Sequence, residues 1–114
     1  MKRTAISTAL VALLILTSCS TIRTPRDKFL LARDSFTAVE KSIMAAHDSN
    51  IITDQELLGF ETAILSGQSI LESADGYLQR HPEGSDGFDA ALATLDAITT
   101  ALAKTLHNEM RDGN

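Results

Sequence analysis

The chain has 114 residues, with 10 basic and 15 acidic side chains and a formal net charge of −5. This length suits one small domain with a single apolar core. From residue 45 onward, only Arg80, Lys104 and Arg111 are set against 12 acidic residues, which argues against nucleic acid as a partner because phosphate binding needs a basic surface.

The first 18 residues have the organisation of a secretory signal. Lys2 and Arg3 give a positive start, an apolar run from Ala5 to Ser18 follows, and small residues precede the only cysteine, Cys19. The apolar run is shorter than the roughly 20 residues that cross a bilayer as a helix. We therefore predict a cleavable signal peptide over residues 1–18.

The sequence Leu16-Thr17-Ser18-Cys19 resembles the lipobox of bacterial lipoproteins. The resemblance implies cleavage before Cys19, a thioether-linked diacylglycerol on its sulfur and a further acyl chain, of the palmitate type, on its new amino group. Two or more acyl chains anchor a protein stably. Ser20 stands where lipoproteins of the inner membrane usually carry Asp, so the resemblance favours the outer membrane, facing the periplasm. An ordinary signal peptide with an incidental cysteine, or a short membrane anchor, is the alternative.

Residues 19–24 form the lipidated N-terminus and a short linker in this interpretation. Cleavage removes Lys2 and Arg3 but no acid, which leaves 8 basic and 15 acidic residues and a net charge of −7. Four of the remaining basic residues cluster in or just after the linker: Arg23, Arg26, Lys28 and Arg33. Each contributes about 1 kcal/mol to binding if it lies near an anionic leaflet, but a solvated linker explains the cluster equally well.

Three amphipathic helices are predicted over residues 25–112. The first begins at Pro25 with Thr24 as its N-cap, and Asn50 is a candidate left-handed residue at its end. Its apolar residues repeat every three to four positions on one stripe: Phe29, Ala32, Phe36, Val39, Ile43 and Ala46.

The second helix begins with a capping box formed by Thr53 and Glu56, and Ile52 is placed to pack against Leu57 as a hydrophobic staple. It ends before His81-Pro82, because proline disfavours helix at the residue that precedes it. Its predicted buried stripe is Leu57, Phe60, Ile64, Gly67, Leu71, Ala74 and Leu78.

The third helix follows the turn at residues 82–87, with either Ser85 or Asp86 as its cap. Its predicted buried stripe is Phe88, Leu92, Leu95, Thr99, Leu102 and Leu106, with Ile98 and Met110 beside it. Three helices joined by short loops predict an all-α fold, an antiparallel three-helix bundle preceded by the lipoprotein signal peptide.

The second helix also carries a stripe of small residues, two positions out of phase with its apolar stripe. At about 100° per residue, this stripe lies nearly opposite the core. Its members are Gly59, Thr62, Ser66, Ser69, Ser73 and Gly76. A comparable stripe on the third helix is Ala90, Ala93, Ala97 and Ala101. Small residues allow close approach of another helix, so the first stripe is a candidate face for a helical partner protein or a second copy. Small residues tolerated on a solvated surface are the alternative.

No pattern in the sequence points to an enzyme, a metal site or a cofactor. No serine lies in a nucleophile elbow, and no glycine-rich phosphate loop is present. The acids around Asp48 and Asp54 lack the glycine and glutamate of an EF-hand loop. His47 and His107, expected at the same end of the bundle, lack the adjoining carboxylates that would complete a zinc site.

The sequence therefore predicts a small membrane-anchored periplasmic lipoprotein that acts as a non-enzymatic interaction or structural module. The alternative function is a carrier that holds a small apolar ligand within the bundle. The core positions Gly67, Ala74 and Ala91 are the places where small residues leave room for such a ligand.

Overall fold

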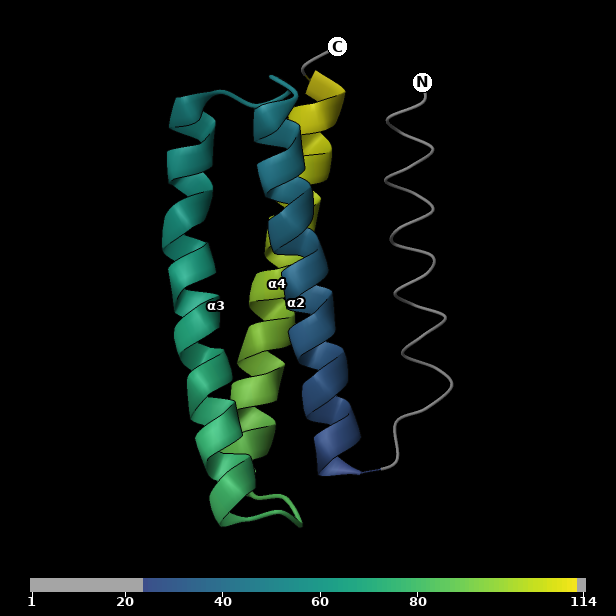
Figure 1. Cartoon of the computed structure of the whole chain (residues 1–114), viewed down its shortest axis with the longest axis vertical. Coiled ribbons are helices and arrows are strands. Elements are labelled where there is room, and N and C mark those ends of the chain that lie inside the picture. Colours follow the sequence, from purple (N-terminus) through teal and green to yellow (C-terminus); the bar gives the residue numbers. More distant parts are fainter. Residues whose placement is uncertain (1–23, 113–114) are drawn as a thin grey trace.

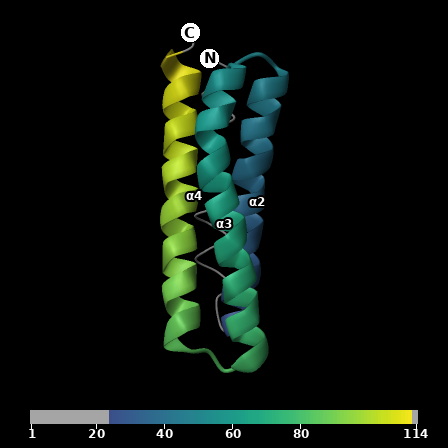
Figure 2. The same cartoon turned by 90° about the vertical axis from the view of Figure 1, so that its left-hand side faces the viewer.

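The computed structural model describes residues 24–112, which form three helices: α2 from Pro25 to Asp48, α3 from Asp54 to Arg80 and α4 from Asp86 to Asp112. The helices run alternately up, down and up, side by side, with a short loop at each turn (Figures 1 and 2). The described residues contain no strand. The predicted all-α fold with three helices is confirmed for this part of the chain.

The ends of α2 follow the predicted capping chemistry. The Thr24 hydroxyl oxygen accepts a hydrogen bond from the backbone N–H of Asp27 at 3.1 Å. At the other end, the N–H of Ser49 donates to the carbonyl oxygen of Ala45 at 3.0 Å. Asn50 follows with a φ of 60°, the left-handed conformation that asparagine tolerates and that ends helices.

The capping box at the start of α3 is also confirmed. The N–H of Glu56 donates to the Thr53 hydroxyl oxygen at 3.1 Å, and the N–H of Thr53 donates to Oε1 of Glu56 at 2.8 Å. Ile52, the predicted staple residue, is 2% exposed. These two hydrogen bonds satisfy backbone donors that a helix start otherwise leaves unpaired.

Ser85, rather than Asp86, caps α4. Its hydroxyl oxygen accepts a hydrogen bond from the N–H of Phe88 at 3.1 Å. The preceding turn contains Gly84 with a φ of 103°, a conformation that favours glycine. A Cβ on Gly87 would lie 2.6 Å from the Tyr77 ring, so the bare backbone there lets α3 pack against the first turn of α4.

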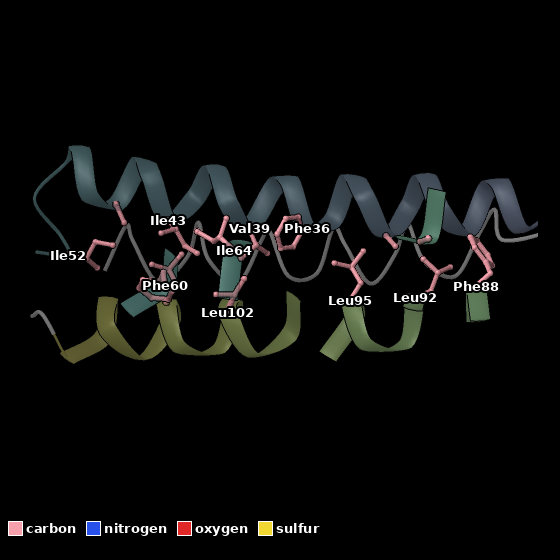
Figure 3. Close-up of a cluster of buried hydrophobic side chains, with 14 residues drawn as sticks. Phe36, Val39, Ile43, Ile52, Phe60, Ile64, Phe88, Leu92, Leu95 and Leu102 are labelled. Atoms are coloured by element: carbon pink, nitrogen blue, oxygen red, sulfur yellow. The ribbon is translucent and has the colours of Figure 1, made fainter. Parts of the chain in front are cut away.

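A single apolar core runs along the bundle between the three helices (Figure 3). Its largest fully buried side chains are Phe36, Ile43, Ile52, Phe88 and Leu95. Most positions of the three predicted stripes are buried, but Phe29, Leu57, Leu71 and Leu78 are only partly buried. Phe29, Leu57 and Leu78 are the first or last members of their stripes, whereas Leu71 lies within its stripe.

The polar and the smallest members of the stripes have specific packing roles. Thr99 is buried, and its hydroxyl donates to the carbonyl oxygen of Leu95 at 2.8 Å, which satisfies the polar group inside the core. A Cβ built on Gly67 would overlap Cε1 and Cζ of the buried Phe36 ring. The ring therefore fills the space beside Gly67 that the sequence suggested for a ligand.

Candidate functional site

The predicted lipid-attachment residue lies outside the described residues. Cys19 and the rest of its lipobox belong to residues 1–23, and Thr24 is the one described residue of the predicted linker. Thr24 lies at the end of the bundle where the loop between α3 and α4 also lies (Figure 1). An anchor on Cys19 would therefore hold the bundle near that end, through only five residues.

The small-residue stripe of α3 points away from the core. Five of its six members are exposed and Gly76 is partly exposed: Gly59, Thr62, Ser66, Ser69, Ser73 and Gly76. A Cβ on Gly59 would meet no atom within 4 Å. In the single chain the stripe is open to solvent, so its role as a partner face stays a prediction.

Two exposed leucines on the same side of α3 were not predicted from the sequence. Leu58 is 61% exposed and Leu65 is 64% exposed. They are seven residues, or two turns, apart, and the helical repeat places them beside Thr62 and Ser69. Their position off the apolar stripe is a sequence signal that a helical wheel centred on the small residues would have revealed. We define the outer face of α3 as Leu58, Thr62, Leu65, Ser69, Ser73 and Gly76.

The C-terminal half of the outer face is hollowed. The hollow measures about 330 Å³ and is lined by Ser69, Glu72, Ser73, Gly76, Tyr77 and Arg80. The Arg80 guanidinium lies 5.2 Å from the centre of the Tyr77 ring, and its Nε donates to the carbonyl oxygen of Gly76 at 3.2 Å. The leucines therefore project from one half of the outer face, and small residues leave a recess in the other half.

A second concave region lies between α3 and α4, at the opposite end from the hollow. This groove measures about 390 Å³ and is lined by Glu56, Gly59, Phe60, Ala63, Ile98, Ala101, Leu102, Thr105 and Glu109. Its lining is mainly apolar apart from Thr105 and the two glutamates. Gly59, Ala63 and Ala101 are too small to fill the space between the helices, which leaves the groove open to solvent.

The carboxyl groups of Glu56 and Glu109 meet in the lining of this groove. The hydrogen bond between them holds the pKa of Glu56 below its ordinary value, and the backbone N–H of Thr53 lowers that pKa further. A carboxylate stabilised in this way stays charged at neutral pH. The groove therefore combines an apolar surface with a fixed negative charge.

The small-residue stripe of α4 is exposed along its length. It consists of Ala90, Ala93, Ala97 and Ala101. Ala101 belongs to the groove between α3 and α4, whereas Ala93 and Ala97 line neither that groove nor the hollow. Of the two stripes, only that of α3 is accompanied by exposed leucines.

His47, near the C-terminal end of α2, pairs with acids rather than with a second histidine. Its Nε2 lies 2.6 Å from Oδ1 of Asp54, and its Nδ1 lies 3.8 Å from Oδ1 of Asp48. A positive charge there is favourable at a helix C-terminus. Within residues 24–112, no group of three or more histidine, cysteine, aspartate or glutamate side chains is arranged to hold a metal ion.

The His47–Asp54 pair predicts a pH dependence. The hydrogen bond to Asp54 raises the pKa of His47 above its ordinary value of 6.5. The stabilisation of the folded state by the His47–Asp54 pair is therefore fully present below pH 6.5. It is lost as the pH rises through the pKa of His47 in the folded state. We expect a histidine titration by NMR to give a lower pKa for His47 in Asp54→Asn than in the parent. An unchanged pKa would contradict the pairing.

Compared with known proteins, the chain matches no family model, no curated protein and no solved structure. Across residues 24–112, no helix is long and apolar enough to cross a bilayer.

Proposed function

We propose that this chain is a lipid-anchored periplasmic lipoprotein whose three-helix bundle is a non-enzymatic interaction or structural module. The observation that carries the proposal is Cys19, the only cysteine, at the end of a short apolar run and directly after Leu16-Thr17-Ser18. A lone cysteine in a secreted chain has no internal disulfide partner. Lipidation explains both its presence and its position.

The outer face of α3 supports the interaction role. Leu58 and Leu65 are each more than 60% exposed, although burying a leucine side chain contributes about 1.5–3 kcal/mol. Single exposed leucines are common on proteins, but these two share one face with small residues and a hollow. Such a face is suited to close contact with another helix.

Ser20, after the cysteine, favours the outer membrane for the anchored protein.

A ligand carrier is the second candidate function, and the groove between α3 and α4 is the observation that favours it. Because Phe36 fills the space beside Gly67, an apolar ligand would bind in this groove rather than in the bundle interior. An apolar molecule that copurifies with the protein from cells, and is lost from an Ala101→Leu variant, would favour the carrier.

The anchor is tested by Cys19→Ala in cells fed a palmitate analogue. We expect complete loss of label and loss of flotation with membranes, because the variant lacks the sulfur that receives the diacylglycerol. Ser20→Ala, which keeps the cysteine, is the matched control and should remain labelled. Label that persists in Cys19→Ala would remove the basis of the proposal.

A further inference from the structure

We propose that the partner of the outer face is a second copy of this chain, docked with α3 antiparallel to α3 about a two-fold axis at the level of Gly67. This inference names the partner and rests on the proposed role as an interaction module. It is carried by three observations on α3: the exposed leucines, the hollow and the distribution of charge.

The shape of the outer face is complementary to itself. Leu58 and Leu65 project from its N-terminal half, and the hollow containing Ser69 and Gly76 lies in its C-terminal half. Leu58 and Leu65 are seven residues apart, and so are Ser69 and Gly76. In the antiparallel register centred on Gly67, Leu65 of each copy therefore lies opposite Ser69 of the other, and Leu58 lies opposite Gly76.

The charges at the ends of α3 agree with the same register. Asp54 lies 13 residues before Gly67 and Arg80 lies 13 residues after it, so each Asp54 is opposite Arg80 of the second copy. The Asp54 side chain is 95% exposed, although its Oδ1 also contacts Nε2 of His47 at 2.6 Å. Arg80 is exposed at the rim of the hollow, where its guanidinium also faces the Tyr77 ring. Exposed ion pairs contribute little to affinity, but they help to fix orientation.

A parallel arrangement would lose both kinds of complementarity. It would place Asp54 beside Asp54, set the leucines against each other and leave both hollows unfilled. A two-fold interface uses the same surface patch on both copies. Helix α3 carries both the projecting leucines and the hollow, at equal spacing. A second copy of the chain therefore meets this requirement without any other protein.

The arrangement is compatible with two lipid anchors in one membrane. Antiparallel pairing places the Thr24 ends of the two bundles at opposite ends of the dimer. Both ends face the same membrane when the bundles lie along its surface with the two-fold axis along the membrane normal. The anchored dimer would then lie flat instead of standing upright.

The pairing is tested by crosslinking between two full-length copies in cells. One tagged copy carries Leu65→Cys and a differently tagged copy carries Ser69→Cys. A short bismaleimide spans the thiols, because paired helix axes lie about 8–10 Å apart. We expect a dimer that contains both tags. The matched control places Ala93→Cys and Ala97→Cys on the exposed stripe of α4, at the same four-residue spacing. The parent chain, which has no introduced cysteine, measures any background crosslinking through Cys19.

The register is tested by charge reversal in the same crosslinking background. Arg80→Asp in both copies places two aspartates together at each end and should reduce the mixed dimer, and adding Asp54→Arg should restore it. A mixed dimer no more abundant than with the α4 pair would overturn the inference. If the chain still incorporates palmitate in that case, the proposed anchor stands while the pairing fails. If instead an unlabelled chain crosslinks through α3, the pairing stands while the anchor fails.

Discussion

Ile64→Ala is expected to lower the free energy of unfolding by about 2–5 kcal/mol, the range for truncating a large buried aliphatic side chain. Ile64 is 7% exposed and belongs to the same buried apolar core as Phe60 (Figure 3). Leu65, the next residue, is 64% exposed and provides the matched control. Leu65→Ala should change the unfolding free energy of the dilute, monomeric protein by at most about 0.5 kcal/mol, as surface substitutions usually do.

Urea denaturation of the chain from Ser20 onward, followed by circular dichroism, measures both variants under identical conditions. Leu71→Ala should fall between them, because Leu71 is only partly buried. Equal losses for Ile64→Ala and Leu65→Ala would mean that the core and the outer face have been assigned to the wrong sides of α3.

Gly67→Ala should destabilise the bundle, although alanine favours a helix over glycine by up to about 1 kcal/mol. The new Cβ would overlap the Phe36 ring, and that ring is 1% exposed, so it has no open space to move into. Overpacking of this kind costs about 1–3 kcal/mol. The steric penalty therefore exceeds the gain in helix propensity.

Gly59→Ala is the matched control for Gly67→Ala, on the same helix. Its Cβ would meet no atom within 4 Å, so we expect the gain in propensity alone, a stabilisation of about 0.5–1 kcal/mol. The two glycine variants should thus shift the melting temperature in opposite directions. A stabilised Gly67→Ala protein would show that α3 does not pack closely on Phe36.

The helix boundaries were predictable because they depend on local chemistry. Thr24, Thr53 and Ser85 cap helices through hydrogen bonds to residues three positions along the chain, so a short stretch of sequence contains both partners. The apolar residues that repeat every three or four positions are also close in sequence, so the pattern predicted which side of each helix is buried.

The features that depend on the arrangement of different helices were not predictable in this way. The close contact of Gly67 with Phe36 joins α3 to α2, and the hydrogen bond of Glu56 with Glu109 joins α3 to α4. A stripe shows which side of a helix is buried, but not which residue of the neighbouring helix it meets. The partial burial of Leu71, which lies within the predicted stripe, has the same origin.

The candidate site was predictable only in part. The small residues from Gly59 to Gly76 stood out because their spacing follows the helical repeat. Leu58 and Leu65 were overlooked, because each directly follows an apolar stripe residue, Leu57 or Ile64, and does not itself extend the stripe. Their position off the apolar stripe could have been read from a helical wheel, and the structure shows that the bundle leaves that side of α3 uncovered.

The intact mass of the full-length protein, extracted from the membranes of the cells that make it, shows whether the signal is cleaved before Cys19 and whether Cys19 carries a lipid. We expect a chain that begins at Cys19 and carries the mass of a diacylglycerol plus one N-linked acyl chain. A chain that retains Met1, or one that begins elsewhere with an unmodified Cys19, would contradict this expectation.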